Sequence, residues 1–275
     1  MIDDKKELSP TRVLYLSHGG GPLPLLGDAG HVELVNTLQK IAASMLKPSA
    51  IVVISAHWEE ENVTITAAKK PQLIYDYGGF PKAAYALAYP ALGEPELARE
   101  IQAALCAGGV EAELDEQRGW DHGMFVPLKI MYPEADVPCV QLSLLHSMDA
   151  AAHLSMGEVI AERLAALNQD NLLIVGSGFS FHNMQAFFES PHAASQRKNE
   201  AFEAWLMETC ASRQLSEVER RERWLHWEQA PFARYCHPRE EHLLPLHVCY
   251  GVAGRACREV FEMKVMGKKA SMYLW

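Results

Sequence analysis

The sequence predicts an α/β fold with a central mixed, mostly parallel sheet, helices on both of its faces, and a small antiparallel C-terminal element. Three observations support this prediction. Short apolar runs alternate with longer amphipathic stretches along the chain. Several short runs are apolar on both faces, which is typical of strands in a sheet that is covered on both sides. The last two apolar runs are close enough in sequence to pair as a hairpin.

Strands and helices alternate along most of the chain. Short apolar runs predict strands over residues 13–17, 50–55, 63–67, 137–144 and 171–176. Amphipathic stretches predict helices over residues 32–46, 94–107, 150–167 and 196–210. The second of these helices carries Glu94 and Glu96 in its first turn, where acids interact favourably with the positive end of the helix dipole.

The region from residue 214 onwards breaks this alternation. Residues 214–236 are rich in Glu, Arg and Trp and predict a helix or an ordered loop. From Glu240 we expect one more helix, followed by strands over residues 260–266 and 271–274 that can pair as the antiparallel element. Neither an internal repeat nor a low-complexity linker divides the chain, so we predict a single domain over residues 1–275.

The composition describes an acidic globular protein. Of the 275 residues 49% are hydrophobic, and 35 acids outnumber 25 basic residues for a net charge of −10. This balance argues against nucleic acid or an anionic membrane as a partner. No signal peptide is evident, and no apolar run approaches the ~18–20 residues of a membrane span. The six scattered cysteines contain no CxxC pair, which predicts reduced, buried thiols and a cytoplasmic location.

Three of the twelve histidines follow predicted strands. His18 directly follows the first strand and leads into Gly19-Gly20-Gly21, and His57 follows the second strand. His182 follows the fifth strand after a glycine-rich turn. The carboxyl ends of parallel strands meet at one edge of a sheet, where ligands bind. Because imidazole suits both Zn and Fe(II), the pattern predicts a metal site at that edge.

Two further regions combine histidine with carboxylates. Asp121 can cap a helix over the apolar stretch that follows it, with His122 pointing into a pocket. Near the C-terminus, Glu241 and His242 are both suited to bind a metal. His247 lies five residues beyond His242, so the two do not share a helical face, and we assign His247 to the core. We predict no role for His31, His146, His153, His192 and His226.

The glycines after His18 are also compatible with the oxyanion loop of an esterase. That function requires a G-x-S-x-G nucleophile elbow, and the nearest segments, Gly176-Ser-Gly-Phe-Ser180 and Leu154-Ser-Met-Gly157, do not match it. The glycines lack the Lys-Ser/Thr of a phosphate loop, and no GxGxxG follows a strand. We therefore expect neither an α/β-hydrolase nor a nucleotide-binding protein.

Six short segments, spread over nearly the whole chain, occur in an order that matches one enzyme family. They are His18-Gly, Ser55-Ala-His57-Trp58, Asp76-Tyr-Gly-Gly-Phe-Pro81, Trp120-Asp-His122-Gly, His182-Asn183 and Pro238-x-x-Glu241-His242-x-x-Pro-Leu. Together they resemble the class III extradiol ring-cleavage dioxygenases of the LigB-like superfamily, in particular the 4,5-DOPA extradiol dioxygenase-like branch. The Ser-Ala-His-Trp and Gly-Gly-Phe-Pro segments are the specific ones, whereas His-Gly alone is not.

The resemblance implies that His18, His57 and His242 bind the metal. It also implies that His182 lies in the same pocket, as a fourth ligand or as the acid/base, and that His122 lines the substrate site. The wider class uses two histidines and one carboxylate on Fe(II), whereas this branch has a histidine at the third position, and Glu241 keeps the carboxylate alternative open. A site of neutral ligands also accepts Zn. We therefore expect Fe(II) as the working metal and Zn(II) as a second metal that the site can bind.

These residues together predict a catalytic domain that cleaves the aromatic ring of a DOPA-like catechol and incorporates both atoms of O2. His182 is expected to move protons, and His122 to orient the substrate or stabilise superoxide. Arg239 is a candidate partner for a substrate carboxylate. Two alternatives share the metal site, namely a zinc-dependent hydrolase and a metal-binding protein without catalysis. The sequence predicts neither the identity of the catechol nor the oligomeric state.

Overall fold

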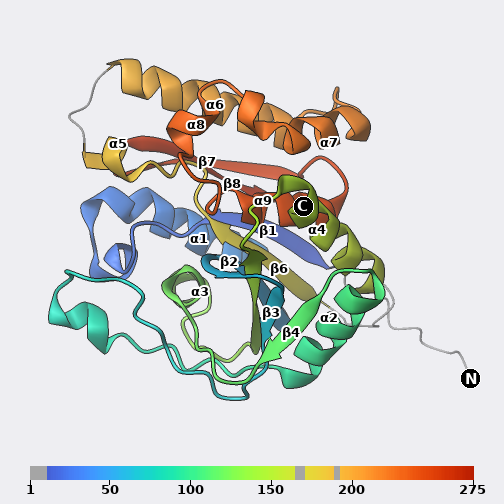
Figure 1. The fold of residues 1–275 in the computed structure, drawn as a ribbon. Helices are drawn as coiled ribbons and strands as arrows, with labels where there is room; N and C mark the ends of the chain where they lie inside the picture. Colours follow the sequence, from blue (N-terminus) through green and yellow to red (C-terminus); the bar gives the residue numbers. More distant parts are fainter. Residues whose placement is uncertain (1–10, 165–170, 189–192) are drawn as a thin grey trace, which may run out of the picture.

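A computed structural model describes residues 11–164, 171–188 and 193–275, which form one eight-stranded sheet with helices on both faces (Figure 1). The strands are β1 (Arg12–Ser17), β2 (Ala50–Glu60), β3 (Val63–Thr66), β4 (Ala112–Asp115), β5 (Cys139–Leu145), β6 (Leu172–Gly178), β7 (Glu259–Val265) and β8 (Lys268–Leu274). Their order across the sheet is β4-β3-β5-β2-β6-β1-β8-β7. β5, β2, β6 and β1 are parallel neighbours, and the β7–β8 hairpin joins β1 in the antiparallel direction. The predicted fold class is confirmed.

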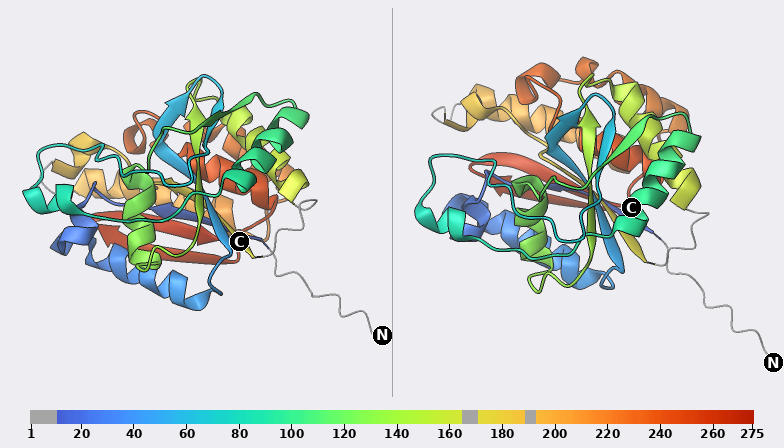
Figure 2. Two further views of the ribbon diagram at one scale, coloured as in Figure 1. Left: turned by 90° about the horizontal axis from the view of Figure 1, so that it is seen from below. Right: turned by 60° about the horizontal axis from the view of Figure 1, so that its bottom comes forward.

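The helices are α1 (Val32–Ser44), α2 (Pro95–Ala107), α3 (His122–Met131), α4 (Ala150–Leu164), α5 (Met184–Phe188), α6 (Ala193–Ala211), α7 (Glu217–Leu225), α8 (Ala233–Cys236) and α9 (Leu244–Ala253), with 3-10 turns η1 (Leu23–Leu26), η2 (Ala29–His31), η3 (Lys82–Ala86) and η4 (Trp227–Gln229). α1 and α3 pack on one face of the sheet, and α2, α4 and α9 on the other. The β7–β8 hairpin lies between α1 and α6 (Figure 2). Within the described ranges, no helix combines the length and the apolarity that crossing a membrane requires.

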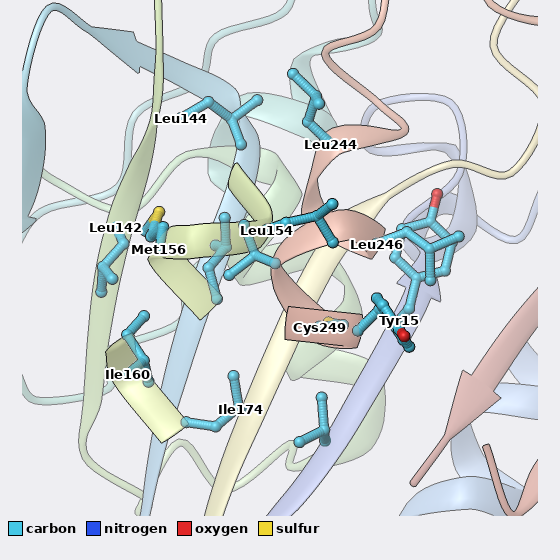
Figure 3. Packing of buried hydrophobic residues seen from close by; sticks show 14 of the residues in the cluster. Tyr15, Leu142, Leu144, Leu154, Met156, Ile160, Ile174, Leu244, Leu246 and Cys249 are labelled. Atoms are coloured by element: carbon cyan, nitrogen blue, oxygen red, sulfur yellow. The ribbon is translucent and has the colours of Figure 1, made fainter. Parts of the chain in front are cut away.

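The central strands are buried on both faces, because their alternate side chains belong to two separate apolar cores. In β1, Val13 and Tyr15 belong to the core beneath α4 and α9, whereas Leu14 and Leu16 belong to the core beneath α1 and α3. Figure 3 shows Tyr15 and neighbouring strand residues packed against side chains of α4 and α9. Runs that are apolar at every position therefore mark strands in the covered centre of the sheet, as predicted.

The boundaries of some elements differ from the prediction. β2 continues to Glu60 instead of ending at residue 55, because its register against β5 shifts between Ile54 and Glu59 and pairing then resumes. β4 was missed, because its sequence Ala-Glu-Leu-Asp shows little of the apolar character that identified the central strands, and it lies at the sheet edge. The end of the predicted helix over residues 150–167 lies partly outside the described residues. The segment over residues 214–236 forms α7, η4 and α8.

The prediction of buried thiols is confirmed for five of the six cysteines and is wrong for Cys106. Cys106 belongs to α2, whose apolar face presents Leu97, Ile101 and Leu105 to the core. Its side chain is exposed because Cys106 lies on the other side of this helix. An amphipathic helix places one side toward water whatever the residue type there, so composition alone misplaced this thiol.

α4 and α9 approach each other closely at two glycines. A Cβ atom on Gly157 of α4 would lie 2.2 Å from Val248 O and 2.9 Å from Gly251 Cα of α9. A Cβ atom on Gly251 would lie 2.3 Å from Leu154 O. This crossing holds α9 against the sheet, and α9 begins at Leu244, directly after the segment that carries His242.

We predict that Gly157→Val lowers the free energy of unfolding by about 3 kcal/mol, because the added side chain forces the two helix backbones apart. The melting temperature should fall by about 6 °C or more, measured by circular dichroism. Ala151→Val adds two methyl groups at an exposed position of the same helix and serves as the control. Equal melting temperatures for the two variants would contradict the packing described.

Candidate metal-binding active site

His18 stands at the carboxyl end of β1, where the chain leaves the sheet. Its backbone N–H donates to Gly178 O at the end of the neighbouring strand β6 (3.0 Å). Its ring Nδ1 lies 2.9 Å from Gly19 O. Gly19 has a φ of +90°, which glycine adopts readily, and a Cβ atom there would lie 2.8 Å from Pro24 and 2.9 Å from His31. Glycine at position 19 therefore allows the turn in which the Gly19 carbonyl faces the His18 ring.

His57 lies in the part of β2 where the strand register shifts. Its backbone N–H donates to Ser55 Oγ (3.2 Å), and this hydroxyl donates to Asp121 Oδ1 (2.8 Å). The ring packs directly on Gly123, where a Cβ atom would lie 2.9 Å from His57 Cδ2. Two segments that the sequence could not connect, one in β2 and one at the start of α3, thus position this imidazole together.

His122 is the first residue of α3, and Asp121 is its N-cap, as predicted. Asp121 Oδ1 accepts a hydrogen bond from the backbone N–H of Met124 (3.2 Å). The backbone N–H of His122 donates to Asp76 Oδ1 (2.9 Å), and its ring Nδ1 also lies 2.9 Å from that oxygen. Asp76 Oδ2 is 3.7 Å from His57 Nδ1. One carboxylate therefore faces two imidazoles of the site.

His242 and His182 stack on each other, although 60 residues separate them in sequence. Their ring centroids are 3.3 Å apart and the ring planes are tilted by only 16°. Glu241 Oε1 lies 3.0 Å from His242 Nδ1 and 3.2 Å from His182 Nδ1. Glu241, which the sequence left as an alternative metal ligand, is thus placed so that one oxygen faces both rings.

The predicted site residues gather at the edge of the sheet where β1, β2 and β6 run side by side. Ring nitrogens of His18, His57 and His122 lie within 4.8 Å of one another, and ligand atoms of His182, Glu241 and His242 form a second such group. The two groups adjoin, because the His242 ring centroid is 5.2 Å from that of His18 and 5.0 Å from that of His57.

This arrangement fits a divalent metal ion. Nε2 of His18 and Nε2 of His57 are 3.2 Å apart, and two nitrogens that each lie about 2.0–2.1 Å from one ion are separated by about 2.9–3.4 Å at common ligand angles. His242 Nε2 is buried and has no hydrogen-bond partner among the described residues. Nδ1 of His18 and Nδ1 of His242 each face an oxygen. Metal-binding imidazoles typically donate their second N–H in this way.

The site combines neutral imidazoles with charged carboxylates. Burial, followed by the neighbouring imidazoles, holds the pKa values of His18, His57 and His242 well below 6.5. The neutral ring is the form that binds a metal. Burial alone would raise the pKa of Asp76, but its contact with His122 outweighs this effect and the pKa is lowered. The pKa of Glu241 is lowered in the same way by His182.

A cavity of about 380 Å³ opens above these rings. All five histidines that the sequence singled out for the site line it, and the remaining wall is formed by apolar and aromatic side chains and by glycines. The lining residues are His18, Gly19, Gly20, Gly21, Leu23, His57, Tyr77, Phe80, His122, Phe179, His182, Met184, Phe187, Phe188, His242 and Met266. The volume is within the usual range for a small-molecule site, about 300–1,000 Å³.

Two residues near the site have surroundings that the sequence did not indicate. Asp76 lies in one of the six segments, but an aspartate in a loop is too common to identify as a partner of histidines. Arg239, the candidate partner for a substrate carboxylate, directs two guanidinium nitrogens at the carboxylate of Glu59 (2.5 and 2.6 Å). It is not among the residues that line the cavity. The arrangement therefore gives no support to a role for Arg239 in binding substrate.

The other histidines lie outside the cavity. His247 is buried and its Nε2 lies 3.1 Å from Trp224 O, in the core as predicted. His31 and His153 are buried and accept hydrogen bonds from backbone N–H groups of Gly20 and Leu145. His146 and His226 are exposed, and His192 lies outside the described residues. None of the described ones requires a role in the site.

The chain is similar to known proteins over almost its entire length. Residues 14–273 match the family model of the catalytic LigB subunit of aromatic ring-opening dioxygenase. The chain is 42% identical to dioxygenase tasH of Hapsidospora irregularis, over 88% of this chain and 78% of that protein. It is 37% identical to a 4,5-DOPA dioxygenase extradiol of Beta vulgaris, over 87% of this chain and 86% of that protein.

The fold is also shared with a solved structure. The crystal structure of an uncharacterized protein from Escherichia coli K12 superimposes with a TM-score of 0.71 at 28% sequence identity, over 96% of this chain and 99% of that one. The family match covers every segment on which the resemblance was based. The chain therefore belongs to the LigB family of aromatic ring-opening dioxygenases and is an extradiol dioxygenase of the branch that includes the 4,5-DOPA enzymes.

Proposed function

We propose that this protein is a single catalytic domain that uses Fe(II) to cleave the ring of a catechol with O2, in the cytoplasm. The observation that supports this most is the convergence of the His18, His57 and His242 imidazoles beside β1, β2 and β6. Family membership supplies the ring-opening reaction and a small-molecule substrate. The catechol, the choice of metal and the role of each residue are the content of the proposal.

In this proposal His18, His57 and His242 hold the metal through Nε2. Nδ1 of His18 and Nδ1 of His242 lie within hydrogen-bond distance of Gly19 O and Glu241 Oε1, and these oxygens orient the two rings. Asp76 Oδ2 faces His57 Nδ1 at the longer distance of 3.7 Å. Bound Fe(II) would act as a Lewis acid for the two catechol oxygens and allow electrons to pass from the ring to O2. Zn(II) fits the same neutral ligands but has no redox chemistry, so it can occupy the site without supporting turnover.

His182 is the proposed acid/base. Its ring lines the cavity, and its Nδ1 lies 3.2 Å from Glu241 Oε1. With Nδ1–H held by this carboxylate, Nε2 can accept a proton from a catechol hydroxyl and return it later. His122 is proposed to orient the substrate, because Asp76 holds both its backbone N–H and its Nδ1, while the ring itself lines the cavity.

The aromatic wall has a separate task in this proposal. Tyr77 contacts His122 with ring centroids 5.7 Å apart, and Phe179 contacts His18 with centroids 6.2 Å apart. These rings shield the imidazoles from bulk water and present flat apolar surfaces to an aromatic substrate. A cavity with a polar floor and apolar walls favours a ligand whose hydroxyls occupy one edge of a ring.

We predict that His18→Ala and His242→Ala each reduce bound metal from roughly one ion per chain to about a tenth of that, because one ligand of three is lost. Metal content after dialysis can be measured by plasma mass spectrometry. His146→Ala removes an exposed imidazole elsewhere and is the control. Glu241→Gln separates the two ligand sets: retention of metal agrees with a histidine as third ligand, and loss of metal would favour the carboxylate.

His182→Ala should keep its metal and bind catechol, but kcat should fall by about 100-fold or more, as is typical when a general base is removed. Metal analysis and single-turnover kinetics on the same sample provide the measurement. Loss of metal would instead assign His182 as a fourth ligand. Turnover at the level of the unmodified protein would contradict the acid/base role.

The reaction itself can be tested after anaerobic reconstitution with Fe(II). Addition of catechol and O2 should give stoichiometric oxygen uptake at an electrode and a yellow ring-fission product by absorbance. Reconstitution with Zn(II) should give neither, because zinc cannot pass electrons to O2. Ester or amide hydrolysis by the zinc form, without oxygen uptake by the iron form, would favour the alternative of a zinc hydrolase.

A further inference from the structure

We infer that the substrate is an uncharged catechol with a short apolar substituent, and not an amino acid or another carboxylate. This inference rests on the proposed function, because it assumes that a catechol binds with its hydroxyls toward the imidazole floor. It concerns the part of the cavity beyond that floor, which receives whatever the ring carries.

The walls of the cavity offer apolar groups almost exclusively. Apart from the imidazoles and the glycines, the lining side chains are Leu23, Tyr77, Phe80, Phe179, Met184, Phe187, Phe188 and Met266. Phe179 and Phe187 contact each other with ring centroids 5.6 Å apart, and Phe80 contacts Tyr77 at 5.5 Å. No lysine, arginine, aspartate or glutamate is among the described residues that line the cavity.

Two arginines near the site residues are engaged with other groups. Arg239 pairs with Glu59 through two nitrogens, and its Nη1 lies 3.6 Å from Glu241 Oε2. Arg118 lies 3.2 Å from Asp121 Oδ2, and its guanidinium stacks 4.3 Å from the Trp58 ring. Neither arginine lines the cavity. A substrate carboxylate would therefore find no ionic partner among the described side chains that line the cavity, which is unfavourable for a charged group that leaves water.

The charged groups nearest the cavity lie at its imidazole floor. Asp76 and Glu241 stand directly behind the imidazoles, where Asp76 Oδ1 lies 2.9 Å from His122 Nδ1 and Glu241 Oε1 lies 3.2 Å from His182 Nδ1. In the proposed function a metal ion on these imidazoles would be the nearest positive charge, and the two catechol oxygens would face it. The ring substituent would then point away from the floor toward the apolar wall, where burial favours an apolar group.

The entrance of the cavity has the same character. Met184 and Phe188 line it and are 53% and 76% exposed. Large apolar side chains that gather around an opening typically mark a ligand-binding site, because their exposure is otherwise unfavourable. The volume of about 380 Å³ is at the lower end for small-molecule sites and suits one ring with a short chain.

A matched pair of ligands tests the charge requirement alone. 3-(3,4-Dihydroxyphenyl)propionate and its methyl ester have the same ring and chain, but only the acid is charged. We expect kcat/KM of the iron protein to be about 10-fold or more higher for the ester. Titration calorimetry on the zinc-loaded protein should give a lower Kd for the ester by a similar factor, which measures binding independently of turnover. Equal values, or a preference for the acid or for DOPA, would overturn the inference.

A variant tests whether the missing cation is the cause. Met184→Lys places an ammonium group at the rim of the cavity, and the exposure of Met184 lets the longer polar side chain reach water. The ratio of ester to acid should narrow by about threefold or more, as expected for one partly exposed ion pair. Met184→Gln removes the thioether without adding charge and should leave the ratio as it is. A ratio that Met184→Lys does not change would contradict the electrostatic explanation.

The failure of this inference differs from the failure of the proposed function. If no catechol, including unsubstituted catechol and 4-methylcatechol, causes oxygen uptake with Fe(II), the proposed function fails. If catechols are cleaved but the carboxylate-bearing ones are cleaved equally well or better, only the inference about the substituent fails.

Discussion

The structure of the site depends on packing five imidazoles into one small, largely apolar cavity. Such a cluster is unfavourable on its own, because a buried ring nitrogen without a partner costs about 1–3 kcal/mol, and His242 Nε2 is one. Burial, followed by repulsion between the imidazoles, lowers the pKa values of His18, His57 and His242, so these rings are neutral. A metal ion that binds several of these ring nitrogens would satisfy their lone pairs, so the cluster is suited to bind a metal.

Glycines allow the segments around the histidine cluster to approach one another closely, and these contacts hold the histidines in place. Gly178 at the end of β6 approaches His242 O so closely that a Cβ atom would lie 2.1 Å from it. The same carbonyl accepts hydrogen bonds from Phe179 N–H (3.0 Å) and from the hydroxyl of Tyr15 (2.9 Å). His242 is therefore attached to the ends of β6 and β1, although it belongs to a loop before α9. Gly123 leaves room for the His57 ring, because a Cβ atom there would lie 2.9 Å from His57 Cδ2.

The sequence predicts the central sheet and three of the cavity histidines from local patterns. Strands that are apolar at every position have few alternatives, and His18, His57 and His182, which follow such strands, converge by topology. The expected roles of His122 and His242 came from the family resemblance, because neither residue directly follows a strand. Asp76, the role of Glu241 and the pairing of Arg239 with Glu59 depend on contacts between distant segments, which no local pattern encodes. The extension of β2 depends likewise on its register against β5.

One carboxylate oxygen of Glu241 lies against both His182 and His242, whose rings are stacked. Neither ring can rotate without losing its shared acceptor and disturbing the other. Glu241 therefore holds two side chains with different proposed roles, the metal ligand His242 and the acid/base His182. A substitution at any of these three positions affects both metal binding and proton transfer. The effects of two such substitutions on activity are therefore not expected to be additive.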